Sequence, residues 1–178
     1  MEYLDICDAE GNLTGQKKTK KEAHEQGLWH RSVHVWIINS QNEILLQRRS
    51  PLVDNYPNMW DISAAGHVSA GEDCVRAALR ETEEEIGLKI KPEELEQIGE
   101  VKQTSKREGY INNEINPIYI VKRDLEVDKI KKQDEEVAAV KFMPYRELQS
   151  LIENKDTSLV SHPEEYILLF KYFSGIMA

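Results

Sequence analysis

The stretch GHVSAGEDCVRAALRETEEEIGL, residues 66–88, decides which fold this sequence predicts. It begins with a loop bounded by glycines and continues as a helical pattern that is dense in acidic side chains. Only Arg76 and Arg80 offset the acidic residues, which are Glu72, Asp73, Glu81, Glu83, Glu84 and Glu85. Such a concentration of negative charge in one short helix needs a physical reason.

The helix predicted over residues 72–87 has one apolar and one acidic stripe. The apolar stripe recurs at steps of three and four residues and comprises Val75, Ala78 or Leu79, Thr82 and Ile86. On another face, Glu81, Glu84 and Glu85 lie within one turn. Two unit charges about 5 Å apart repel by roughly 3 kcal/mol at an effective dielectric constant near 20. These carboxylates therefore need a positive partner, or they must partly protonate.

Two interpretations fit this acidic face. Carboxylate oxygens at such a density suit Mg²⁺ or Mn²⁺, which prefer oxygen ligands and often bridge to substrate phosphates. The alternative is a solvated acidic face without a ligand, which is the common fate of charge runs. The spacing of the three glutamates alone does not separate these interpretations.

Fixed positions around the glutamates favour the metal. They fit the pattern G-x5-E-x7-R-E-U-x-E-E-x-G-U, where U is usually a bulky aliphatic residue, at Gly66, Glu72, Arg80, Glu81, Glu84, Glu85, Gly87 and Leu88. The first U position departs from the pattern because Thr82 stands there, within the apolar stripe. This pattern is the Nudix box, and the chain resembles the Nudix family.

The resemblance implies an α/β fold, a Nudix-type α/β/α sandwich with a mixed sheet and a loop-helix-loop catalytic box. It also implies a divalent-metal-dependent hydrolase, with Mg²⁺ or Mn²⁺ as cofactor, that cleaves the diphosphate linkage of a nucleoside diphosphate derivative or a related small diphosphate. The implied metal ligands are Glu81, Glu84 and Glu85. The implied catalytic residues include Glu84, Glu81 and Arg80, and Arg80 would orient a glutamate and pair with Glu72. Bound cations lower the pKa of water and neutralise charge on phosphate oxygens, which agrees with this chemistry.

The general base lies outside the box, and Nudix enzymes recruit it from different places. The segment DEEVAAVKFMPYREL, residues 134–148, resembles the part of many Nudix proteins that follows the box. Glu136 is therefore the candidate for an extra ligand or a catalytic base, and Glu135 is equally near. Solvated loop charges are the alternative for both residues.

Sequence ahead of the box resembles isopentenyl diphosphate isomerases, which share the Nudix fold. The resemblance lies in GLWHRSVHVWIIN, ILLQRRS and YPNMWDISAAGHVSAGED. In these isomerases histidines and glutamates hold a divalent metal. His67 matches the last of those histidines and is a predicted metal ligand, His30 matches an upstream one, and His24 stands near a third with shifted spacing. Glu114 lies where the isomerases have a glutamate pair, but Asn112 replaces its neighbour.

One departure argues against isomerisation. The isomerases carry a proton-transferring cysteine just before the GH pair, where this chain has Ala64 and Ala65. Alanine neither donates nor accepts a proton. The box glutamates are all present, so the sequence predicts a hydrolase on an isomerase-like frame. An isomerase and a catalytically silent nucleotide-binding module remain the alternatives.

Substrate contacts are expected from loops and strand ends. Arg48 and Arg49 end a strand, and alternation lets only one of them face the site. Tyr56 is a candidate for stacking on a base. The loops expected to set specificity are residues 50–58 and residues 102–113.

The rest of the chain reads as strands and helices around the box, with residues 1–178 forming a single Nudix domain. Residues 1–30 are expected to form an N-terminal hairpin and a short helix, and residues 31–178 the core. Strands are predicted at residues 32–39, 43–49, 94–105, 114–125 and 136–144, and C-terminal helices at 145–154 and 163–175. Helices on both faces of one sheet would result.

Composition limits the function further. The formal net charge of -9 argues against binding of nucleic acid polymers and leaves small-molecule diphosphates as substrates. Two cysteines are too few for a disulfide framework, and neither a membrane span nor a signal peptide is apparent. We therefore expect a cytoplasmic protein without a membrane partner. A homodimer remains open.

Overall fold

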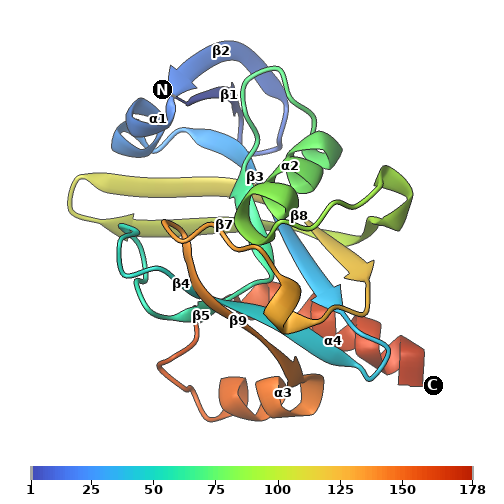
Figure 1. Cartoon of the computed structure of the whole chain (residues 1–178). Coiled ribbons are helices and arrows are strands. Elements are labelled where there is room, and N and C mark those ends of the chain that lie inside the picture. The colour runs from blue at the N-terminus through green and yellow to red at the C-terminus, as the bar shows by residue number, and fades with distance from the viewer. Residues whose placement is uncertain (1, 178) are drawn as a thin grey trace.

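A computed structural model describes residues 2–177, whose nine strands join one mixed sheet (Figure 1). The strands are β1 (Tyr3–Cys7), β2 (Leu13–Thr19), β3 (Trp29–Ile38), β4 (Glu43–Arg49), β5 (Trp60–Asp61), β6 (Ala64–His67), β7 (Glu96–Arg107), β8 (Tyr110–Lys122) and β9 (Val137–Pro144). The α-helices are α1 (Lys20–Gln26), α2 (Cys74–Ile86), α3 (Tyr145–Glu153) and α4 (Pro163–Met177). No helix of the described part is long and apolar enough to cross a lipid bilayer.

Strand β3 is the centre of the sheet. It pairs in parallel with β8 and antiparallel with β1, β4 and β6. Its residues from Ser32 to Ile38 are all buried, as expected for a strand covered on both faces. The N-terminal hairpin of β1 and β2 joins the same sheet through the pair Cys7 and Trp29.

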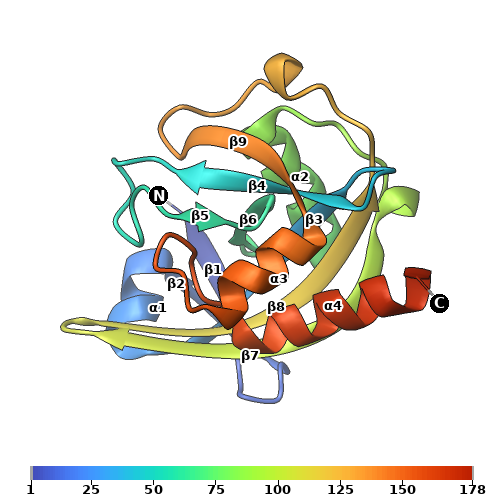
Figure 2. The ribbon, with the colours of Figure 1, turned by 90° about the horizontal axis from the view of Figure 1, so that it is seen from below.

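Two hydrophobic cores lie on opposite faces of the sheet. On one face Val33 and Val35 pack with Ala78 of α2, and on the other Trp36 packs with Phe173 of α4. Figure 2 shows α3 and α4 in front of the sheet and α2 behind it. The predicted α/β/α sandwich with a mixed sheet is thereby confirmed.

Helix α2 differs in detail from the predicted one. It begins at Cys74, where the Asp73 side chain caps it by accepting from the Arg76 amide, and it ends at Gly87 in the left-handed conformation. Val75, expected in the buried stripe, is only partly buried, whereas Ala77 is fully buried. The expectation for Val75 was wrong because β6 and β3 contact the helix closer to Ala77.

Residues 102–113, expected to be a loop, form the outer part of the β7–β8 hairpin. The two strands remain paired out to Arg107 and Tyr110, and the turn occupies only two residues, with Gly109 at a positive φ of 67°. These strands looked like a loop because their outer ends are polar on both faces. Backbone pairing and the bond from Thr104 Oγ1 to Asn113 Oδ1 hold them instead. The loop at residues 50–58 is irregular, as expected.

Candidate active site

Two acidic residues of α2, Glu81 and Glu85, are turned toward β6. Glu81 and Glu85 are buried, at 8% and 5% exposure, whereas Glu84 is exposed. The Glu85 Oε2 atom accepts hydrogen bonds from the Ala65 amide at 3.1 Å and from Gln47 Nε2 at 3.0 Å. Both donors are uncharged, so no cation among these contacts balances Glu85.

Arg80 forms hydrogen bonds with three acidic residues of the box. Its Nη1 atom donates to Glu81 Oε1 at 2.6 Å and to Glu84 Oε2 at 3.1 Å. Its Nε and Nη2 atoms donate to Glu72 at 3.0 and 2.9 Å, and Nη2 also donates to the His67 carbonyl. The carboxylate of Glu72 holds the pKa of Arg80 above its ordinary value, and Glu81 adds to this effect. The guanidinium is thus fixed between the start of the box and its glutamates.

The buried carboxyls resist ionisation without further positive charge. Burial raises the pKa of Glu81 to about 7, and Glu84 and Glu136 add to the rise while Arg80 opposes it. Burial also raises the pKa of Glu85 well above its ordinary value. A divalent cation would compensate this charge, and carboxylate oxygens are its preferred ligands. The donor set of the box therefore fits a divalent metal.

A second group of potential metal ligands comes from four elements of the fold. It consists of His24 on α1, His30 on β3, His67 on β6 and Glu114 on β8. Glu114 Oε1 lies 3.3 Å from His67 Nε2 and 3.7 Å from His30 Nε2. The Nε2 atoms of all three histidines are buried and have no hydrogen-bond partner among residues 2–177.

The electrostatics of this His3Glu cluster also suit a metal. Burial lowers the pKa of His24 to about 4 and lowers that of His67, so both rings are neutral at pH 7. Burial acts to raise the pKa of Glu114, but His30 and His67 hold it well below its usual range. The His30 Nδ1 atom lies 2.8 Å from the Leu28 carbonyl, so Nδ1 carries the hydrogen and Nε2 is free to bind a metal.

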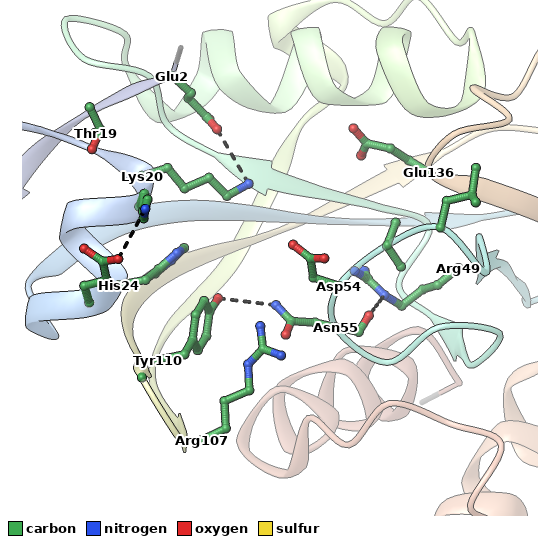
Figure 3. A pocket seen from close by; sticks show the side chains of 15 residues that line it. Glu2, Thr19, Lys20, His24, Arg49, Asp54, Asn55, Arg107, Tyr110 and Glu136 are labelled. Atoms are coloured by element: carbon green, nitrogen blue, oxygen red, sulfur yellow. Dashed lines mark hydrogen bonds and ion pairs between the residues drawn. The ribbon is translucent and has the colours of Figure 1, made fainter.

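A cleft of about 640 Å³ lies beside the box and reaches one member of the His3Glu cluster, His67. It is also lined by Glu81, Glu84 and Glu85 and by four other predicted residues, Arg49, Tyr56, Arg80 and Glu136. A neighbouring pocket of about 730 Å³ shares Arg49 and Glu136, and Figure 3 shows these side chains around it with Tyr110 and Lys20.

The two predicted arginines point to different sides. Arg49 faces the cleft, where Nη1 donates to Asp61 Oδ2 at 3.2 Å and Nε donates to the Asn55 carbonyl at 2.8 Å. Arg48 lines neither cavity, and its guanidinium lies 6.0 Å from the centre of the Trp60 ring. The structure therefore places Arg49, and not Arg48, where a substrate could be bound.

Comparison with known proteins decides the family. The model of the NUDIX domain matches residues 28–162 of the chain. The chain belongs to the Nudix family. Because this match includes the box, membership supports pyrophosphohydrolase activity.

Three curated relatives place the chain more closely. Nudix hydrolase 3 of Arabidopsis thaliana is 38% identical over 90% of this Nudix chain, but the match covers only 22% of that protein. An uncharacterized Nudix hydrolase of Clostridium acetobutylicum is 37% identical over 86% of the chain and 75% of its own length. An isopentenyl-diphosphate Delta-isomerase of Serratia proteamaculans is 33% identical over 67% of the chain and 65% of its own length. The resemblance to isopentenyl diphosphate isomerases expected from the sequence is therefore confirmed.

A solved structure supports the fold. A protein of Deinococcus radiodurans superposes with a TM-score of 0.69 and 19% identity, covering 94% of this Nudix chain and 97% of its own. This likeness extends over the sheet and the helices on both of its faces.

Sequence reasoning left several buried polar residues out of the predicted site. His24 and Glu114 were indicated only through the isomerase resemblance, and His24 at a shifted spacing. His34 and Glu165 make a buried ion pair that the sequence did not predict. No local pattern connects residues so far apart in sequence.

Proposed function

We propose that this Nudix protein is a divalent-metal-dependent hydrolase, using Mg²⁺ or Mn²⁺, that cleaves the diphosphate linkage of a nucleoside diphosphate derivative or a related small diphosphate. The observation that carries the proposal is the pair of buried carboxyls, Glu81 and Glu85, whose raised pKa values call for a cation beside the cleft. The Nudix family match supports the same chemistry.

The proposed roles follow from the contacts. Glu81, Glu84 and Glu85 hold the metal, and Arg80 keeps Glu81 and Glu84 in place through its Nη1 atom. Bound cations neutralise charge that develops on phosphate oxygens and lower the pKa of water. Glu136 is exposed and lines the cleft, which supports a role in accepting the proton of the attacking water.

Other residues of the cleft would bind the substrate. The Arg49 guanidinium is held by Asp61 and by the Asn55 carbonyl, and this fixed orientation suits a phosphate oxygen. Tyr56 is half exposed in the irregular loop and is placed to cover a substrate ring. His67 would serve the metal of the His3Glu cluster together with His24.

The isomerase alternative is favoured by one observation, the His3Glu cluster. Two observations oppose it. By the isomerase resemblance, Ala64 and Ala65 stand where the isomerases carry their cysteine, and Asn112 stands in place of one glutamate of the isomerase pair. A silent binding module is opposed by the complete box and by the close contact of Arg80 with its glutamates.

The experiment that tests the proposal is a Mg²⁺-dependent assay of the purified protein, followed by phosphorus NMR. The panel should hold nucleoside triphosphates, dinucleoside polyphosphates, sugar nucleotides and isopentenyl diphosphate. Split diphosphates that disappear with excess chelator and reappear with Mg²⁺ or Mn²⁺ would support hydrolysis. An unsplit panel would refute it, and a shifted prenyl double bond would identify an isomerase.

A further inference from the structure

A buried ion pair at the base of the cleft is not explained by metal binding in the box. His34 on β3 is 5% exposed and Glu165 on α4 is 2% exposed. His34 Nδ1 lies 2.8 Å from Glu165 Oε2, and Trp36 Nε1 donates to Glu165 Oε1 at 2.6 Å. Because a carboxylate only accepts hydrogen bonds, Nδ1 of His34 carries a hydrogen.

The charge of Glu165 is balanced by His34. The Trp36 indole is a neutral donor, and of the two histidines beside Glu165 the nearer is His34, at 2.8 Å, whereas His162 Nδ1 lies 3.8 Å away. Burial acts to lower the pKa of His34, but the Glu165 carboxylate outweighs it and raises that pKa above its ordinary value. The Glu165 carboxylate therefore favours the cationic form of the ring.

The charged groups around the His34–Glu165 pair have partners of their own. Asp61 on β5 is bonded to Arg49 at 3.2 Å and to His162 Nε2 at 2.8 Å. Glu114 on β8 also acts on His34, and the His162 ring centre lies 5.5 Å from that of His34. His34, His162 and Glu165 have the composition of a metal site. However, the pairs Asp61–Arg49 and Glu165–His34 balance their charges without a metal.

The cleft connects the His34 ring with the box. His34 pairs with Ala65 across β3 and β6, so the two side chains project from the same face, the one that α4 covers. The Ala65 amide donates to Glu85 Oε2, and His34 lines the same cleft as Glu81, Glu84 and Glu85. Since Nδ1 is bonded to Glu165, Nε2 is the ring nitrogen available to a substrate.

We propose that His34 donates its Nε2 proton to the leaving-group oxygen of the diphosphate, and that Glu165 is the positioning residue that holds the ring; this inference rests on the proposed hydrolase function. In the step, the oxygen of water bonds to phosphorus and the bond from phosphorus to the leaving oxygen breaks. That oxygen takes the Nε2 proton, while the proton of the attacking water passes to a base such as Glu136. Neutral His34 keeps its Nδ1 hydrogen on Glu165 and regains a proton from solvent before the next turnover.

The test uses the best substrate of the diphosphate panel and compares His34→Gln and Glu165→Gln with the unchanged protein. In the unchanged protein kcat should fall as pH rises through the pKa of His34. His34→Gln should lower kcat by about 10²-fold or more, with KM changed only a few-fold, and should abolish this alkaline fall. Glu165→Gln removes the partner that raises the His34 pKa, so the alkaline fall should move to lower pH.

Tyr166→Phe is the control for damage to α4, because its hydroxyl donates to the Val160 carbonyl and makes no contact with His34. It should lower Tm and leave the alkaline fall in place. If His34→Gln retains the alkaline fall, or if Glu165→Gln and Tyr166→Phe behave alike, the proton-donor role is refuted while hydrolysis stands. If the unchanged protein splits no diphosphate, the proposed function fails, and this inference fails with it.

Discussion

The Glu81 carboxylate occupies the space that any side chain at Gly66 would need. A Cβ atom added to Gly66 would collide with the carboxylate carbon and both oxygens of Glu81. The first glycine of the box therefore has a steric role, because it lets α2 bring a buried glutamate onto the end of β6.

Gly66→Ala should displace Glu81 and lower kcat by about 10²-fold, because misplacing a reacting or ligating group by about 1 Å can cost that much. The measurement is the Mg²⁺-dependent rate together with Tm. Gly175→Ala is the matched control, since nothing lies near its added methyl group and it stands in the exposed last turns of α4. It should leave the rate unchanged and raise stability by about 0.4–1 kcal/mol. Equal rates in the two variants would contradict the steric role.

Glu84→Gln should lower turnover by about 10³-fold and leave the fold intact, because Glu84 is an exposed proposed ligand and no part of the core. Glu83→Gln is the control: Glu83 is the adjacent exposed glutamate and forms an ion pair only with Lys89, at 3.2 Å. Steady-state kinetics at saturating Mg²⁺ would compare the turnover of the two variants, and circular dichroism would verify that both are folded. Full activity of Glu84→Gln would remove this residue from the metal site.

The box could be predicted from the sequence because its contacts are local. All of its residues lie within positions 66–88, and helix geometry alone brings Arg80 onto Glu84 one turn later. The sandwich fold followed from the resemblance and from the alternation of strands and helices. Strand alternation also indicated that only one of Arg48 and Arg49 faces the site.

The burial of the glutamates could not be predicted in this way. Periodicity placed Glu81 and Glu85 on a face separate from the core, which is correct for the helix by itself. Their burial depends on β6, whose residues Ala65 and Gly66 meet that face of the helix in the folded chain. Which carboxyl titrates abnormally is therefore a property of tertiary packing.

Contacts between residues that are distant in sequence were still harder to predict. His34 and Glu165 are separated by 131 positions, and no spacing rule connects them. Polar residues at the outer ends of β7 and β8 suggested a loop, because polar strands without an apolar face resemble loops in composition. Backbone pairing within this hairpin, which residue composition does not report, decided the outcome.

Glu85→Gln should stabilise the metal-free protein at pH 8. The folded-state pKa of Glu85 is raised, so the folded protein binds more protons than the unfolded chain above the ordinary value of 4.5. The stability that this group contributes is therefore present below pH 4.5 and is lost as pH rises through the folded-state pKa. Glutamine keeps an oxygen for the Ala65 amide but carries no charge.

The measurement is thermal unfolding in excess chelator at pH 5.5 and pH 8, with and without added Mg²⁺. At pH 8 the Tm of the variant should exceed that of the unchanged protein by about 2–4 °C for each kcal/mol of burial cost that the substitution removes. At pH 5.5 the difference in Tm should be smaller. Mg²⁺ should stabilise the unchanged protein more than the variant, since the variant lacks a ligand. A variant that is less stable than the unchanged protein at pH 8 would show that Glu85 is not under electrostatic strain.

His24→Gln should reduce the metal content by one ion per chain while the box keeps its own metal. The His3Glu cluster offers three imidazoles and one carboxylate, a donor set that suits Zn²⁺ or Co²⁺ better than Mg²⁺. Metal analysis after dialysis against Zn²⁺, and the visible spectrum of the Co²⁺ form, would count and describe this site without an activity assay. His34→Gln is the matched histidine control and should keep the full metal content, because His34 is bonded to Glu165 and lies outside the cluster. Equal metal content in the unchanged protein and His24→Gln would refute the second site.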